Sequence, residues 1–63
     1  MKKVVFKFST LAMAKEVMNM MIADYMSEFI YASNIGRKVI FTTDFPKRTR
    51  IAVGKVVSSI ENA

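Results

Sequence analysis

The chain has 63 residues, 52% of them apolar, and its ten Lys and Arg against five Asp and Glu give a net charge of +5. Because it has neither cysteine nor histidine, it can form no disulfide, thiol nucleophile, imidazole base or ordinary zinc site. The composition therefore predicts a single ordered domain over residues 1–63, in a reducing cytoplasmic setting, without a metal or another cofactor.

The first residues resemble a secretory signal peptide in one respect. Two lysines precede an apolar stretch, and Ala12 and Ala14 have the spacing of a cleavage site. Lys7 interrupts that stretch, and cleavage would remove an expected strand, so we favour the cytoplasmic interpretation. No run reaches the roughly 18 uncharged apolar residues of a membrane span, and we expect no membrane association.

The first expected element is a strand over about 3–8. Apolar side chains alternate there with other positions, at Val4, Phe6 and Phe8, which predicts an aromatic buried face. Ser9 or Thr10 follows and offers a side-chain oxygen to the first free amides of a helix. The chain is thus expected to turn from strand to helix at these two residues.

One long helix is expected over about 10–33. Its apolar residues recur with helical spacing, no proline or glycine interrupts it, and Gly36 can adopt the left-handed conformation that closes a helix. A second apolar ridge, displaced from the core face, contains Met13, Met20 and Tyr31. We interpret this ridge as a candidate interface with a second copy of the chain.

Two further strands are expected over about 37–44 and about 49–58, with a turn at Pro46. The order β-α-β-β predicts a two-layer α+β fold, with the helix packed on a three-stranded antiparallel or mixed sheet. This arrangement resembles half of a ferredoxin-like fold, with the strand at 49–58 in the centre. The uncovered sheet face would expose Val5, Ile40, Ala52 and Val56. Because so small a domain has no disulfide or metal ion to stabilise it, we expect a homo-oligomer that buries this face or the helix ridge.

The positive charge is concentrated in one part of the sequence. Residues 36–55 contain six cations against Asp44 alone, whereas the remaining residues sum to zero. The six cations are Arg37, Lys38, Lys47, Arg48, Arg50 and Lys55. On the expected hairpin they form a basic ribbon that suits a phosphate backbone, and six phosphates neutralised on duplex DNA predict a log–log salt slope of about −5.

No residue pattern indicates catalysis. Asp24 and Glu28 stand four apart on the expected helix, but no third acid and no glycine-rich loop accompanies them. We therefore favour an exposed or lysine-paired role for these two acids. Serine hydrolase chemistry lacks its histidine, and Gly36 and Gly54 match no nucleotide-binding motif. The sequence predicts a protein that is not an enzyme.

Two classes of partner remain open. The first is nucleic acid, DNA or RNA, contacted by the six basic residues; base stacking on strand aromatics is disfavoured because Phe6, Phe8 and Phe41 are expected in the core. The second is an acidic protein surface, for which this basic chain would be a stoichiometric regulator such as an inhibitor, an antitoxin or a phage-type host-takeover factor. An enzyme assembled across subunits is the least favoured interpretation.

Overall fold

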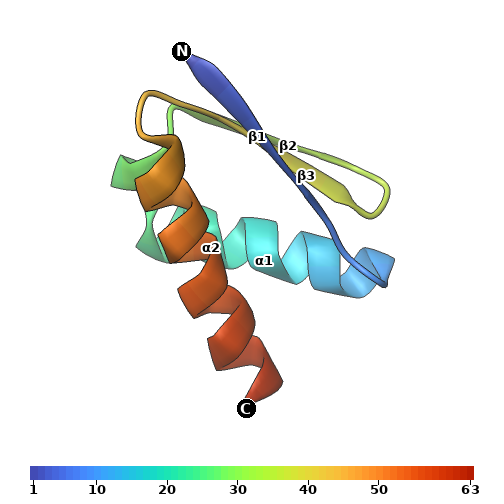
Figure 1. The fold of residues 1–63 in the computed structure, drawn as a ribbon. Coiled ribbons are helices and arrows are strands. Elements are labelled where there is room, and N and C mark those ends of the chain that lie inside the picture. Colours follow the sequence, from blue (N-terminus) through green and yellow to red (C-terminus); the bar gives the residue numbers. More distant parts are fainter.

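A computed structural model describes all 63 residues. Its elements are β1 (Lys2–Lys7), α1 (Leu11–Asp24), the 3₁₀ helix η1 (Met26–Glu28), β2 (Tyr31–Ile35), β3 (Lys38–Thr43) and α2 (Pro46–Glu61). The strands form one antiparallel sheet in the order β1-β3-β2, and both helices pack on the same side of it (Figure 1). The predicted α+β fold with a three-stranded antiparallel sheet is confirmed. The predicted order β-α-β-β occurs as β1-α1-β2-β3, but the strands come partly from other segments than expected, and the unpredicted helix α2 follows β3.

The start of the chain follows its sequence pattern. β1 buries Val4 and half-buries Phe6, while Lys3 and Val5 on its other face are exposed. Thr10 caps α1, since its side-chain oxygen accepts a hydrogen bond of 3.0 Å from the N–H of the third helical residue. The predictions for the first strand and for the start of the helix are therefore confirmed.

The prediction of one long helix over 10–33 is wrong, because α1 ends at Asp24. After η1 the chain becomes extended at Phe29, whose ring meets the Phe41 ring edge to face, with centroids 5.0 Å apart. The next residues, Tyr31–Ile35, pair with β3 as a strand. Tertiary packing on the sheet therefore overrides the local helical pattern of this segment.

Gly36 has the predicted left-handed backbone, with φ of +59°, but it closes a β-hairpin and not a helix. It is the first of two residues between β2 and β3, where a type II′ hairpin turn needs glycine. The Asn34 side-chain amide stabilises this turn by donating to the carbonyl oxygens of Gly36, at 2.9 Å, and Lys38, at 2.8 Å. The left-handed backbone was predictable because the residue is glycine. That it would form a hairpin turn, and not the end of a helix, was not predictable.

The prediction of a strand over 49–58 is also wrong, because these residues lie in α2. Pro46 occupies the first turn of that helix, where its missing N–H leaves no hydrogen bond unmade. The side chains buried by α2 have the helical spacing i, i+3, i+4, i+7, at Thr49, Ala52, Val53 and Val56. Ala52 and Val56 are therefore core residues and do not lie on a sheet surface. The central strand is β3, and the half-ferredoxin-like arrangement is not confirmed.

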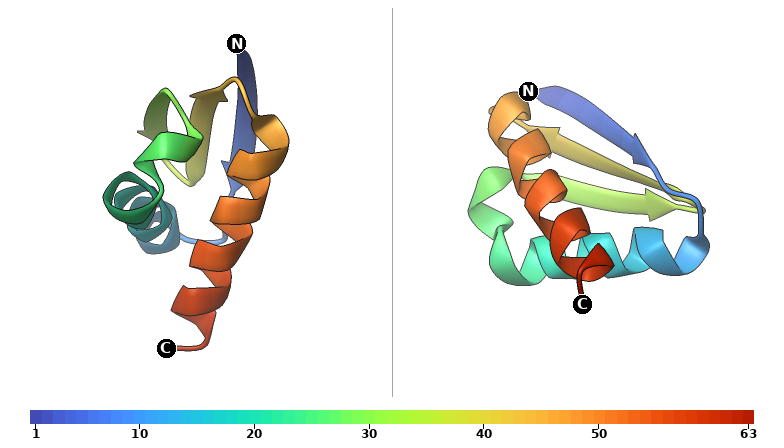
Figure 2. Two further views of the ribbon diagram at one scale, coloured as in Figure 1. Left: turned by 90° about the vertical axis from the view of Figure 1, so that its left-hand side faces the viewer. Right: turned by 60° about the horizontal axis from the view of Figure 1, so that its bottom comes forward.

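The core lies between the sheet and the two helices. Its buried cluster comprises Ala14, Val17, Met21, Val39, Phe41, Ala52, Val53 and Val56. Phe41 is fully buried and also meets the Phe6 ring edge to face, with centroids 5.9 Å apart. In two further views α1 and α2 cross below the sheet, which leaves the opposite face of the strands without a covering element (Figure 2). Neither helix has the length and apolar character needed to cross a membrane.

Candidate nucleic-acid interface

The structure separates the six basic residues that were expected on one hairpin. Arg37 and Lys38 lie at the hairpin turn and at the start of β3. The other four, Lys47, Arg48, Arg50 and Lys55, lie in α2, which begins beyond the far end of β3. Six strand residues at about 3.3 Å each span roughly 17 Å. The six cations therefore do not form a single patch.

The sheet face that no helix covers brings other residues together. Strand pairing places three rows across this face, namely Lys3–Thr42–Tyr31, Val5–Ile40–Ser33 and Lys7–Lys38–Ile35. Side chains alternate between the two faces of a strand, and the burial of Val4, Val39 and Phe41 identifies the covered face. We call these nine residues, together with Arg37 of the adjoining turn, the open face. Val5 and Ile40 were predicted on an uncovered face, and that part of the prediction is confirmed.

The open face carries positive charge at both ends and no charge in its middle row. Lys3, Lys7, Arg37 and Lys38 are exposed, none of them forms a salt bridge, and no acidic residue lies in a strand or in the hairpin turn. Lys7 and Lys38 are direct cross-strand partners. Like charges placed opposite each other destabilise a sheet. A bound anion would relieve that repulsion, so the face is electrostatically suited to phosphate.

A hollow of about 430 Å³ lies at the hairpin end of the open face. It is lined by Lys7, Phe8, Ile35, Arg37 and Lys38. Three cations provide hydrogen-bond donors and charge for a phosphate, and the two apolar side chains provide contacts for the organic group attached to it. The hollow therefore combines three cationic side chains with two apolar ones.

Tyr31 lies in the row at the other end of the open face, beside Thr42 and in line with Lys3. Its side chain is 64% exposed. An exposed aromatic ring on a surface that also carries cations is an arrangement on which proteins stack unpaired bases. The expectation that sheet aromatics would be unavailable holds for the buried Phe41 but not for Tyr31, which was assigned to a helix.

The apolar ridge predicted on a long helix is not formed. Met13 and Met20 lie in α1, are half-buried and pack against the core, whereas Tyr31 lies in β2. The reason is the end of α1 at Asp24, which removes Tyr31 from the helix. The three residues share no helical surface, and their role as an interface stays a prediction.

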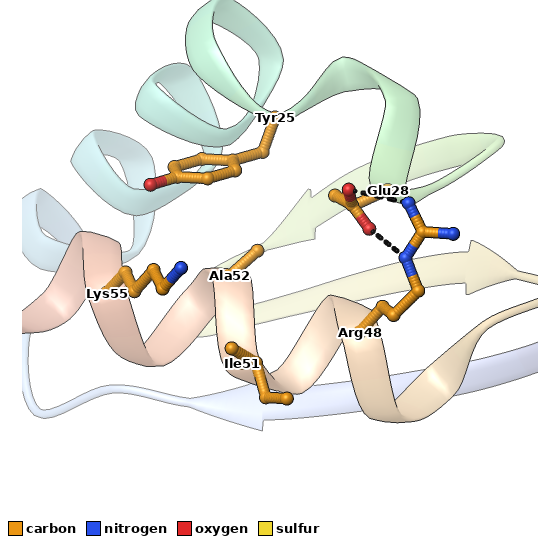
Figure 3. Close-up of a pocket in the computed structure, with 6 residues that line it drawn as sticks. All are labelled: Tyr25, Glu28, Arg48, Ile51, Ala52 and Lys55. Carbon is orange, nitrogen blue, oxygen red and sulfur yellow. Dashed lines mark hydrogen bonds and ion pairs between the residues drawn. The ribbon is translucent and has the colours of Figure 1, made fainter.

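Among the cations of α2, Arg48 already has a partner. Its Nε and Nη2 donate to the two carboxylate oxygens of Glu28, at 2.8 and 2.9 Å (Figure 3). The guanidinium also lies over the Phe45 ring, 4.8 Å from its centroid. The hydrogen bond to Glu28, and then the attraction between the two charges, raise the pKa of Arg48. Arg48 thus connects α2 to η1 and is less available for a phosphate than the lysines of the open face.

A second hollow, of about 160 Å³, lies beside this ion pair (Figure 3). Its lining residues are Tyr25, Glu28, Arg48, Ile51, Ala52 and Lys55. The Glu28 carboxylate in this lining repels an anion, so the hollow suits phosphate less than the open face does. Asp24 and Glu28 were expected on one helix. They lie in different elements, because α1 ends at Asp24 and Glu28 belongs to η1.

Lys3 and Lys7 are the open-face cations that were not predicted as site residues. Summing charge along the chain placed them in a neutral remainder. They lie beside β3 because β1 pairs directly with it, which joins Lys7 to Lys38. The period-two pattern of the first strand already put both lysines on its outer side. The pattern could not predict which strand would pair with the first one.

No family model matches the chain, and neither a curated protein nor a solved structure matches it. The open face itself combines four cations, one exposed aromatic ring and several aliphatic side chains. Asp44, which follows β3 beyond the row of Lys3, is paired with the N-terminal ammonium group at 3.6 Å.

Proposed function

We propose that this chain is a small non-enzymatic binding protein that contacts the phosphates of single-stranded nucleic acid through the open face of its sheet. The observation that supports this proposal is a sheet face with Lys7, Arg37 and Lys38 at one end, Lys3 and the exposed Tyr31 at the other, and no acid among its own residues. Cations on such a surface neutralise successive phosphates, and the aromatic ring stacks on a base between them.

A single strand fits this face better than a duplex does. Val5 and Ile35 are 52% and 61% exposed, and they offer apolar contact to bases that a duplex would keep stacked inside. The duplex interpretation depended on a two-stranded basic ribbon that ended near residue 58. Because that segment is the helix α2, the ribbon does not exist.

The salt dependence of binding tests the phosphate contacts. For four cations on a single strand, we expect log affinity to fall with log salt at a slope of about −3, since each contact contributes about −0.7. The assay is fluorescence anisotropy of a labelled oligonucleotide over a salt series. Replacing Lys7 and Lys38 together by Gln removes two contacts and reduces the slope to about −1.4.

The matched control is the double variant Lys47→Gln and Arg50→Gln, which removes the same charge from exposed positions of α2. We expect this control to keep the slope of the unaltered protein. A slope near zero for the unaltered protein, or an equal loss of slope in both double variants, would contradict contact through the open face.

Variants of Tyr31 test base stacking. Tyr31→Phe keeps the ring and should bind like the unaltered protein, whereas Tyr31→Leu should bind about 5- to 150-fold more weakly, because one stacked base contributes about 1–3 kcal/mol. Equal affinity of the Phe and Leu variants would exclude a stacking role for this side chain.

The alternative is a stoichiometric regulator that binds an acidic protein surface. The same four cations, with the exposed aliphatic side chains of Val5 and Ile35 between them, fit such a surface as well. A protein retained from nuclease-treated lysate by the unaltered chain but not by the Lys7 and Lys38 double variant, combined with no binding to oligonucleotides, would favour this alternative.

A further inference from the structure

The two edges of the sheet differ in charge. β1 forms one edge and includes Lys2, Lys3 and Lys7, and lysines on an edge strand discourage pairing with another strand. β2 forms the other edge and has no charged residue, within an uncharged run from Phe29 to Gly36. In a chain in which about one residue in four is charged, this edge alone lacks that protection.

β2 also directs backbone groups away from the sheet. The Phe8 N–H donates to the Arg37 carbonyl oxygen at 2.8 Å, so Arg37 and every second residue after it direct their backbone groups to β1. The residues between them, Lys38, Ile40 and Thr42, direct theirs to their register partners Ile35, Ser33 and Tyr31 of β2. Hydrogen-bonding direction alternates along an antiparallel strand, so the N–H and C=O groups of Ala32 and Asn34 point away from β3. These four groups need water or another strand as their partner.

The residues of β2 complement a second copy of themselves. If two β2 strands pair antiparallel about a two-fold axis at Ser33, Ala32 lies opposite Asn34 of the partner subunit, and the outward backbone groups meet. In the same register Tyr31 lies opposite Ile35 of the partner subunit. Tyr31 and Ile35 are 64% and 61% exposed in the single chain, so pairing covers an aromatic–aliphatic contact on each side of the axis.

We propose that two copies of this chain pair through the outer edges of β2 into one six-stranded antiparallel sheet. Cross-strand partners lie on the same face of a sheet, so both open faces lie on one side of the dimer. The two sets of cations then form one longer basic surface. The dimer follows from the edge of β2 and not from nucleic-acid binding. Because Tyr31 belongs to both proposals, the dimer is tested at Ser33, which the nucleic-acid proposal does not use, and either proposal can fail without the other.

Solution mass tests the dimer. After nuclease treatment, which removes any bridging nucleic acid, light scattering over a dilution series should give twice the 7.2 kDa of one chain at high concentration. Ser33→Lys places two like charges opposite each other at the two-fold axis, and it should raise the dimer dissociation constant at least about fivefold. The matched control is Val5→Lys, which adds the same charge in the same row of the sheet but at the β1 edge. It should leave the dissociation constant within about twofold of that of the unaltered chain.

A charge exchange at Ser33 separates a specific effect from loss of folding. Ser33→Glu alone should weaken the dimer as Ser33→Lys does, and an equimolar mixture of the two variants should recover the dimer mass, because opposite charges then face each other. Circular dichroism of each variant reports its fold. A monomer over the whole dilution series of the unaltered chain would overturn the proposal. So would a Ser33→Lys variant that dimerises as tightly as the Val5→Lys control.

Discussion

Two buried threonines connect three elements of the fold through the carbonyl oxygen of Glu28. Thr43 of β3 donates to it at 3.0 Å, and the Thr49 hydroxyl of α2 lies 2.5 Å from it, with both side chains fully buried. Thr49 Oγ1 is also 3.0 Å from the Phe45 carbonyl and from the Thr43 hydroxyl. Because a hydroxyl has one hydrogen, the shortest contact takes it, and both threonines donate to the same carbonyl.

This geometry predicts that Thr43→Val and Thr49→Val destabilise the protein more together than the sum of their separate effects. Each single change removes one donor while the carbonyl keeps the other, so each should cost about 1 kcal/mol. Thr43→Val also removes the acceptor of the Phe45 N–H, at 2.9 Å, so it should be the more costly of the two. The double variant leaves the carbonyl without a protein donor, which adds about 1–3 kcal/mol and gives a total of roughly 3–5 kcal/mol. A domain of this size has roughly 3–9 kcal/mol of stability, so the double variant should be close to unfolding.

Urea unfolding followed by circular dichroism measures these free energies, and thermal unfolding should show a Tm loss of about 4–8 °C for each single change. Thr42→Val is the matched control, since Thr42 precedes Thr43 in β3 with its side chain on the open face. It should change the stability by less than about 0.5 kcal/mol. Additivity of the two core changes within about 0.5 kcal/mol would refute the shared-acceptor reasoning.

Two further predictions concern the core and the Arg48–Glu28 pair. Phe41→Ala should cost about 3–5 kcal/mol, because the ring is fully buried and meets two other rings, and loss of the cooperative thermal transition would be the expected readout. A variant that keeps its Tm would show that Phe41 does not organise the core. Arg48→Gln should lower Tm at low salt and lose most of that difference at high salt, since the arginine side chain is 56% exposed. Glu28 raises the pKa of Arg48, so the arginine's contribution is complete below its ordinary pKa and is lost only as pH rises through the raised value. The Tm difference due to Arg48 ionisation should therefore be constant between about pH 7 and pH 10. A decline within that range would contradict the pair.

The sequence alone identified only part of the candidate site, because some of its residues are neighbours in space and not in the chain. Counting charge along the chain identified Arg37 and Lys38 as candidate anion contacts, because that count needs only the sequence, and their role stays a prediction. It could not add Lys7, which lies 31 positions before Lys38 in the chain and beside it in the sheet. Nor could it separate Arg48, whose partner Glu28 comes from another element.

Signals within a few residues determined the parts of the fold that the sequence specified by itself. Alternation produced β1, a hydroxyl at Thr10 began α1, and the glycine at position 36 adopted a left-handed backbone, because each depends on local sterics and hydrogen bonding. The sequence pattern of segments 31–35 and 49–58 is compatible with both a helix and a strand, since apolar residues there recur at both helical and strand spacing. Only tertiary structure resolved them: one strand extends the sheet beside β3, and one helix covers Phe41 and Val39. The physical reason is that burying a shared core between distant segments outweighs the small local preference of either one.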